Sequence, residues 1–231
     1  MKANVLTLYP EMFPGCLGYS LIGKALDEKK WTLNLINIRD FSSNHYKSVD
    51  DTPFGGGAGM IMQPDVLDKA LQSVCPKGEI YYLSPRGETF NQHTAHTWAH
   101  SDEITFICGR FEGVDERVLE KWAIKEISIG DFVLSGGEPA LIAMLDATIR
   151  LIPGVLGNAD SVLEESFSND LLEYPQYTKP QIWEGRKVPD VLISGHHANI
   201  RKWRQEQSEI LTKTRRPDLY KKYLDNQKKG N

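Results

Sequence analysis

The sequence has little cysteine, no long hydrophobic run and no overall excess of positive charge. Its three cysteines, Cys16, Cys75 and Cys108, lie far apart and are odd in number, so they indicate neither a disulfide framework nor paired zinc ligands. No stretch approaches the roughly 20 apolar residues of a membrane span, and the N-terminus lacks the apolar segment of a signal peptide. These absences predict a cytoplasmic protein in a reducing compartment, without a membrane partner.

The charges are unevenly distributed along the chain. Residues 196–231 contain ten lysines and arginines against four acidic residues, a net charge of +6, whereas the whole chain carries 27 − 31 = −4. Residues 1–195 therefore carry −4 − 6 = −10. A basic tail on an acidic body is typical of a segment that contacts nucleic acid, although a solvated helical face gives the same charge count.

The first 150 residues alternate short apolar strands with segments of helical spacing. Strands are expected at 5–9, 32–38, 79–83, 104–108 and 127–134. Helices are expected at 21–29, 63–74 and 114–122. A further helix is expected between the strands at 79–83 and 104–108, and another runs from the glycine pair at 136–137 to Arg150. This alternation predicts an α/β domain with a mainly parallel sheet, and 231 residues can bury that core beside a smaller domain.

After Arg150 the composition changes. The stretch "LIPGVLGNADSVLEESFSNDLLEYPQYTKP" is rich in turn residues and has few periodic apolar positions, which is typical of a linker or a functional loop. Helical spacing returns at 196–213 and 217–229. The expected organisation has three parts: an α/β domain at 1–160, a flexible interdomain linker at 161–190 and a small all-helical domain at 191–231.

Three motifs suggest chemistry but have simpler explanations. "GYSLIGKA" approaches a phosphate-binding loop but has Ala25 where a magnesium-binding hydroxyl belongs, so a helix start is favoured over a nucleotide hydrolase. "HTAHTWAH" spaces its histidines for a helix without a metalloprotease pattern, which favours a solvent-facing helix. "GGGAG" at 55–59 is no dinucleotide fingerprint; it is either a flexible connection or a loop that closes over a ligand or a partner.

Three glycine- or proline-bearing segments follow the expected strands. They are "LSPRG", "CGRFEGVDERV" and "SIGDFVLSGGE", which begin at residues 83, 108 and 128. In a parallel sheet such segments meet at the carboxyl ends of the strands, where α/β folds bind ligands. Few of their residues are cations that could hold phosphate, so they suit a nucleoside held by backbone groups and apolar walls, or they are tight structural turns.

Eight segments, in this order, resemble the bacterial tRNA (guanine-N1)-methyltransferase family of the SPOUT class. They are "VDDTPFGGGAGM", "LSPRG", "CGRFEGVDERV", "SIGDFVLSGGE", "RLIPGVLG", "ESF", "YPQYTKP" and "VPDVLISGHHANIRKWR", and they span nearly the whole chain. The resemblance implies a SPOUT-type α/β fold whose parallel sheet contains a deep trefoil knot, formed by the three ligand segments. It also implies a homodimer whose active sites are shared across the interface.

The cofactor implied by the resemblance is S-adenosylmethionine, with S-adenosylhomocysteine as product, bound by the domain at 1–160. The residues that match the family's cofactor-lining positions are Tyr82, Leu83, Ser84, Pro85, Gly109, Glu112, Gly113, Ile129, Gly130, Asp131, Phe132, Val133, Leu134, Gly136 and Gly137. Magnesium could assist the reaction, but the sequence contains no dedicated set of metal ligands.

The reaction implied is methylation of ring nitrogen 1 of the guanine just 3′ of the anticodon in tRNA. Arg150 matches the family's arginine that stabilises charge on the guanine, although a helix-end arginine also suits the helix dipole. Glu165 matches the base that removes the nitrogen's proton, but the family usually has Asp there. This extra methylene leaves open an alternative, a catalytically impaired RNA-binding member of the same fold.

The implied partner is the anticodon stem-loop of tRNA. The helical domain at 191–231 would bind it, largely through phosphates, with Arg201, Lys202 and Arg204. His45 and Asp50, which precede the glycine-rich loop, are further candidate contacts. Other departures from the family pattern, such as Arg86 where Gln is common and Phe132 where Tyr is frequent, remove no catalytic group.

Overall fold

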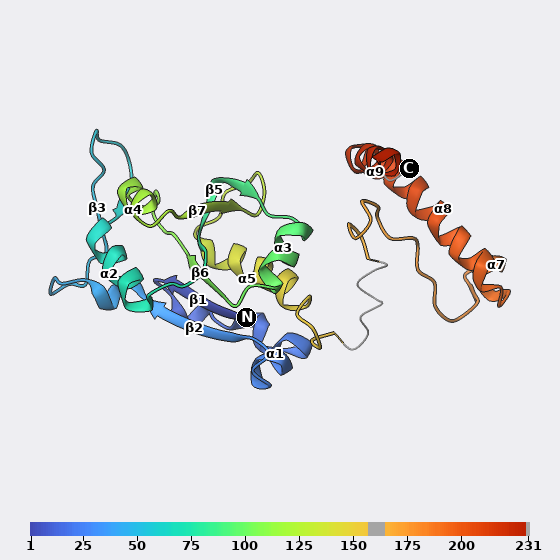
Figure 1. Ribbon diagram of the computed structural model, residues 1–231, viewed down its shortest axis with the longest axis horizontal. Helices are drawn as coiled ribbons and strands as arrows, with labels where there is room; N and C mark the ends of the chain where they lie inside the picture. Colours follow the sequence, from blue (N-terminus) through green and yellow to red (C-terminus); the bar gives the residue numbers. More distant parts are fainter. Residues whose placement is uncertain (157–164, 230–231) are drawn as a thin grey trace. The chain divides into compact units, whose positions relative to one another are not determined.

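The computed structural model describes residues 1–156 and 165–229 (Figure 1). Its chain divides into two compact units, Met1–Gly157 and Asn158–Asn231. The boundary expected at residue 160 and the first residues of the expected linker, 161–164, lie outside the described residues.

The first unit is built on a sheet of five strands that are all parallel. The strands are β1 (Lys2–Thr7), β2 (Thr32–Asn37), β5 (Ile80–Thr89), β6 (Glu103–Ile107) and β7 (Lys125–Ser128). Their order across the sheet is β2-β1-β6-β5-β7, and every hydrogen-bonded pair is parallel. The predicted α/β class with a mainly parallel sheet is therefore confirmed.

Helices connect these strands close to the predicted places. They are α1 (Ser20–Asp27), α2 (Pro64–Val74), α3 (Gln92–Ala99), α4 (Glu116–Lys121) and α5 (Gly137–Ile149). Short 3₁₀ turns occur at Pro10–Met12, Gly15–Gly18 and Ile38–Phe41, and the loop after residue 41 contains a small antiparallel pair, β3 (Asp50–Asp51) and β4 (Ile61–Met62). The "GYSLIGKA" stretch is the start of α1, as the simpler interpretation predicts.

Neighbouring residues of the central strands face opposite helical layers. Tyr82 and Ile107 belong to the core that α2 and α4 cover. Tyr81 and Phe106 face the other way, with ring centroids 4.8 Å and 5.0 Å from that of Trp98 on α3, and α3 packs on α5. The period-2 alternation of the strands therefore fills both faces of the sheet, as parallel sheets require.

Two predicted strand ends are wrong. The strand expected at 79–83 continues to Thr89, because Pro85 and Gly87 lie in an irregularity of β5, where the register with β7 shifts between Leu83 and Glu88, rather than in a turn. A Cβ at Gly87 would lie 2.2 Å from the Ile127 nitrogen, so glycine allows the two strands to touch. The strand expected at 127–134 ends at Ser128, and Gly130 follows with a φ of +150°.

The second unit is mainly helical. It contains α7 (Asp190–Ile193), α8 (His197–Arg215) and α9 (Pro217–Lys229), which confirms the helices predicted at 196–213 and 217–229. A two-stranded hairpin, β8 (Ile182–Trp183) with β9 (Arg186–Lys187), lies within the expected linker, where no strand is predicted. Across both described ranges, no helix combines the length and the apolar character that a membrane span needs.

Candidate active site

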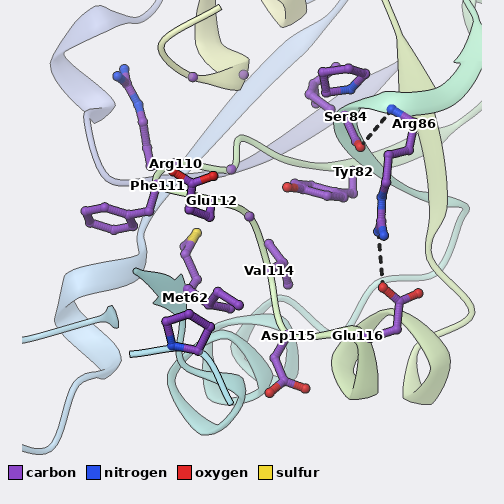
Figure 2. A pocket seen from close by; sticks show the side chains of 18 of the residues that line it. Met62, Tyr82, Ser84, Arg86, Arg110, Phe111, Glu112, Val114, Asp115 and Glu116 are labelled. Carbon is purple, nitrogen blue, oxygen red and sulfur yellow. Dashed lines mark hydrogen bonds and ion pairs between the residues drawn. The ribbon is translucent and has the colours of Figure 1, made fainter. Parts of the chain in front are cut away.

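A cavity of about 1170 Å³ opens in the first unit beyond the ends of β6 and β7 and beside the irregularity in β5. Its lining comes from five segments, at 51–54, 61–65, 82–86, 109–117 and 127–140, although not every residue of the last contributes. Figure 2 shows Tyr82, Glu112 and Met62 around it, with Arg86 directed toward Glu116. The three segments singled out in the sequence thus meet at one site.

Nearly all the residues predicted to line a cofactor lie in this cavity. The exceptions are Gly130 and Asp131, which the turn after β7 carries outside the lining. Leu83, Ile129 and Leu134 form apolar walls, and the lining also contains glycine backbone and eight charged side chains. Apolar walls combined with placed polar groups are typical of small-molecule sites.

The glycines of the cavity allow its segments to pack closely. A Cβ at Gly109 would lie 2.5 Å from the Tyr82 ring, and one at Gly137 would lie 2.9 Å from Cys108 Cα and Leu83 Cβ. Their missing side chains therefore make room first for neighbouring protein, not for a ligand. Gly113, with a φ of +125°, needs glycine for its conformation.

The arginines that line the cavity all have carboxylate partners. Arg86 Nη2 lies 3.1 Å from Glu116 Oε2, Arg110 Nη2 lies 2.9 Å from Glu138 Oε2, and Arg117 Nη2 lies 2.7 Å from Asp115 Oδ2. Among the residues that the structure describes, no lysine lines the cavity. The arginine charges are therefore already compensated, and the lining has five carboxylates against three arginines, so the residues fit a nucleoside without phosphates better than a polyphosphate.

Burial acts on the cavity-lining Tyr82 and on Cys108, which precedes the lining residue Gly109. Burial raises the pKa of the Tyr82 phenol, and the negative charge of Glu126 adds to the effect, so this hydroxyl is a hydrogen-bond donor at neutral pH. Burial also raises the pKa of the Cys108 thiol, again helped by a carboxylate, that of Glu138. Cys108 is fully buried, whereas Cys16 and Cys75 are exposed, so Cys108 is a structural residue rather than a nucleophile.

The two predicted catalytic residues lie in different units and neither lines this cavity. Arg150 follows the last residue of α5 and is half-buried. Glu165 lies in the second unit, where it lines a smaller cavity of about 230 Å³ together with Arg201 and Arg204 of α8. The structure therefore places the predicted base beside two of the predicted RNA-binding residues.

The other predicted RNA contacts are spread over both units. Lys202 is exposed on α8, with its Nζ 3.9 Å from Glu206 Oε1. His45 is exposed in the loop before β3, and Asp50 is in β3 itself, next to the cavity-lining Asp51. Within the described ranges, no three His, Cys, Asp or Glu side chains gather as metal ligands.

Sequence reasoning missed Arg110 and Glu138, which form an ion pair at the cavity wall. Both lie inside segments singled out for their glycines. The available signal was a charged residue directly after a glycine: Arg110 follows Gly109 just after a strand, and Glu138 follows Gly137 at a helix start. It also missed that residues 51–54 line the cavity. Spacing alone cannot show that these positions come together.

The comparisons with known proteins agree over nearly the whole chain. The family model described as tRNA (Guanine-1)-methyltransferase TrmD matches residues 1–222. Proteins named tRNA (guanine-N(1)-)-methyltransferase are 57% identical in Bartonella tribocorum, over 99% of this chain and 98% of the relative, and 55% identical in Ruegeria sp., over 96% and 93%. One from Rhodospirillum rubrum is 52% identical over 97% and 94%. The chain therefore belongs to the tRNA (guanine-1)-methyltransferase family.

Proposed function

We propose that this protein transfers a methyl group from S-adenosylmethionine to ring nitrogen 1 of the guanine that follows the anticodon, position 37 of tRNA. The observation that carries the proposal is family membership over residues 1–222, because it includes the cavity, the segment with Glu165 and most of the basic helices. The paired arginines, the excess of carboxylates and the apolar walls of the cavity support a nucleoside cofactor without phosphates.

The cavity residues hold the cofactor in this proposal. Leu83, Ile129 and Leu134 provide apolar contacts, while the Tyr82 hydroxyl and the backbone of the glycine turns provide hydrogen-bonding groups. When bound, S-adenosylmethionine supplies an activated methyl group on its sulfonium. Gly130 and Asp131 support the turn that carries Ile129 and Phe132, since they are outside the lining themselves.

Glu165 and Arg150 perform the proton and charge chemistry on the guanine. Ring nitrogen 1 carries a proton and is a poor nucleophile, so the Glu165 carboxylate accepts that proton as the methyl group arrives. Negative charge then develops on the neighbouring carbonyl oxygen of guanine, and the Arg150 guanidinium stabilises it. The extra methylene of Glu165, relative to the family's usual Asp, changes its reach but keeps the carboxylate.

The second unit binds the anticodon stem-loop. Arg201 and Lys202 are exposed on α8 and contact phosphates, while Arg204, which stacks 4.7 Å from the Tyr174 ring centroid, orients this surface. His45 and Asp50 contact the RNA from the loop of the first unit. Because the target base lies in a loop, it can be unstacked and read.

The working form is a homodimer with shared active sites. Exposed apolar side chains at the cavity support this: Phe111, Phe132, Val133 and Leu134 all line it, and Val133 is 84% exposed. Mixing the inactive variants Arg150→Ala and Glu165→Gln tests the sharing. If one site takes these residues from different subunits, mixed dimers regain activity; mixtures as inactive as the separate variants contradict it.

The remaining proposals concern the chain path, the parts of the chain, the metal and the compartment. The three cavity segments form the trefoil knot. A hydrogen bond supports this proposal: the Gly137 amide donates to the Gly109 carbonyl at 3.2 Å and so holds the start of α5 against the end of β6.

The chain has three parts in this proposal: residues 1–160 bind the cofactor, residues 161–190 link the two domains, and residues 191–231 bind tRNA. Magnesium assists without a fixed protein site, and the tRNA substrate places the enzyme in the cytoplasm.

The experiment is transfer of a labelled methyl group from S-adenosylmethionine to tRNA transcripts. A transcript with guanine at position 37 becomes labelled, and one with adenine there does not. Equal labelling of both transcripts would contradict the proposal. Salt-dependent binding of tRNA with no transfer to either would instead establish the catalytically impaired alternative.

A further inference from the structure

We propose that Arg110 and Glu138 are a positioning pair that fixes the backbone wall at 134–137 in the geometry that S-adenosylmethionine needs. The inference rests on the proposed cofactor. Neither side chain is assigned to the chemistry, and both belong to the segments around the cavity. In Figure 2 the Arg110 side chain extends away from Tyr82 and Met62.

Glu138 is a carboxylate with no exposed surface in the first turn of α5. Its Oε1 accepts a hydrogen bond of 2.7 Å from Thr7 Oγ1 at the end of β1, and its Oε2 forms the 2.9 Å ion pair with Arg110 Nη2. Thr7 Oγ1 in turn accepts from the Tyr9 amide at 3.0 Å. Glu138 therefore connects the start of α5 to segments that follow two different strands.

Arg110 carries this connection to the wall. Its Nη1 donates to the Ser135 carbonyl at 3.1 Å, and its guanidinium lies 4.5 Å from the Tyr9 ring centroid. A Cβ at Gly136 would lie 2.3 Å from Arg110 Nε, so the glycine backbone rests directly against the guanidinium. The planar guanidinium thus contacts one carbonyl, one carboxylate and one ring at once, in a fixed fork geometry that an ammonium lacks.

Stability alone does not account for this pair. Well-packed neutral residues often replace a buried ion pair without loss of stability, so burial of these charges is weak evidence for a stabilising role. Neutral residues would not, however, hold the Ser135 carbonyl beside the cavity. Because Leu134, Ser135, Gly136 and Gly137 all line the cavity, a shift of this wall alters cofactor contacts, whereas neither Arg150 nor Glu165 lines the cavity.

The test is the double variant R110M/E138Q, which removes both buried charges and keeps an acceptor for Thr7. We expect the Kd for S-adenosylhomocysteine and the KM for S-adenosylmethionine to rise about tenfold or more, because preorganisation is lost. We expect kcat at saturating cofactor and the KM for tRNA to change less than about threefold. Arg110→Lys keeps the charge balance but not the fork, so it weakens cofactor binding as well.

A matched control is K2M/E103Q. It removes the 3.0 Å ion pair between Lys2 Nζ and Glu103 Oε2, which join the first residues of β1 and β6 and do not line the cavity. It leaves cofactor affinity unchanged. The proposal is overturned if R110M/E138Q or a folded Arg110→Lys binds S-adenosylhomocysteine as tightly as the unmodified protein. If the unmodified protein itself binds no S-adenosylhomocysteine, the proposed function fails instead.

Discussion

The two units of the chain differ in what surrounds their functional residues. In the first unit Trp31, Trp98 and Phe106 are completely buried, and the cavity is bounded by strands, glycine turns and paired charges. In the described part of the second unit, two of the four buried residues, Ser208 and Thr212, are polar. The Thr212 hydroxyl accepts from the Leu172 amide at 2.8 Å and donates to the Ser208 carbonyl at 2.6 Å. Arg201 and Lys202 are exposed there.

Under the proposed function, this difference means that one reaction uses two kinds of site. A small cofactor needs a pocket that exists before it arrives, and a packed sheet with close glycine contacts provides one. RNA phosphates bind cationic side chains, which displace the counterions of the phosphates. Exposed lysines and arginines on a helix provide such cations. We therefore expect substitutions in the first unit to affect cofactor affinity, and substitutions on α8 to affect RNA affinity.

The largest effect is expected at Arg150 and Glu165, which are proposed to act in the chemistry and not in binding the cofactor or the RNA. Arg150→Ala and Glu165→Gln should each lower kcat about 10²- to 10⁴-fold, because proton transfer and charge stabilisation are lost in the transition state. Calorimetric titration should show S-adenosylhomocysteine binding as in the unmodified protein. A fully active Glu165→Gln would show that another group is the base.

A substitution in the first unit should weaken cofactor binding alone. Gly137→Ala places a Cβ 2.9 Å from Cys108 Cα and Leu83 Cβ, and overpacking of this kind costs about 1–3 kcal/mol. We expect weaker S-adenosylhomocysteine binding by calorimetry with unchanged tRNA affinity. The matched glycine is Gly185 in the second unit, which has no atom within 4 Å of its Cβ position; Gly185→Ala strains only its own turn and should not affect the cofactor.

A substitution on α8 should do the reverse. In the double variant R201A/K202A, the slope of log affinity for tRNA against log salt should fall by about two, one for each lost phosphate contact. Filter binding over a salt series measures this slope, and cofactor affinity should not change. The control K121A/K125A removes two cations from the first unit and should leave the slope as it is; a loss equal to that of R201A/K202A would remove the distinction between the units.

The smallest effect is expected at the edge of the cavity. Arg86 pairs with Glu116 and Glu126, but its side chain is 59% exposed, and exposed ion pairs contribute about 0–1 kcal/mol. Arg86→Gln removes the charge and should change the free energy of unfolding in urea by less than about 1 kcal/mol. A larger loss would mean that this pair supports the wall formed by β5 and β7.

The sequence predicts the regular parts of both units well and the irregular parts poorly. Periodic apolar residues place α2, α8 and α9 within a few residues, because burial of one helix face determines that spacing. Pro85 and Gly87 favour a turn by local preference, yet contact with Ile127 keeps them in a strand. The pair of Arg110 and Glu138 joins residues 28 apart in the chain (138 − 110), which no local pattern can indicate.

The most direct test of the account is the identity of the methylated nucleoside. After reaction of the unmodified protein with tRNA, nuclease digestion and mass spectrometry locate the new methyl group. We predict 1-methylguanosine at position 37, the product of the guanine-N1 methylation that the family membership supports. Methylation of another guanine atom, or of another position in the tRNA, would contradict it.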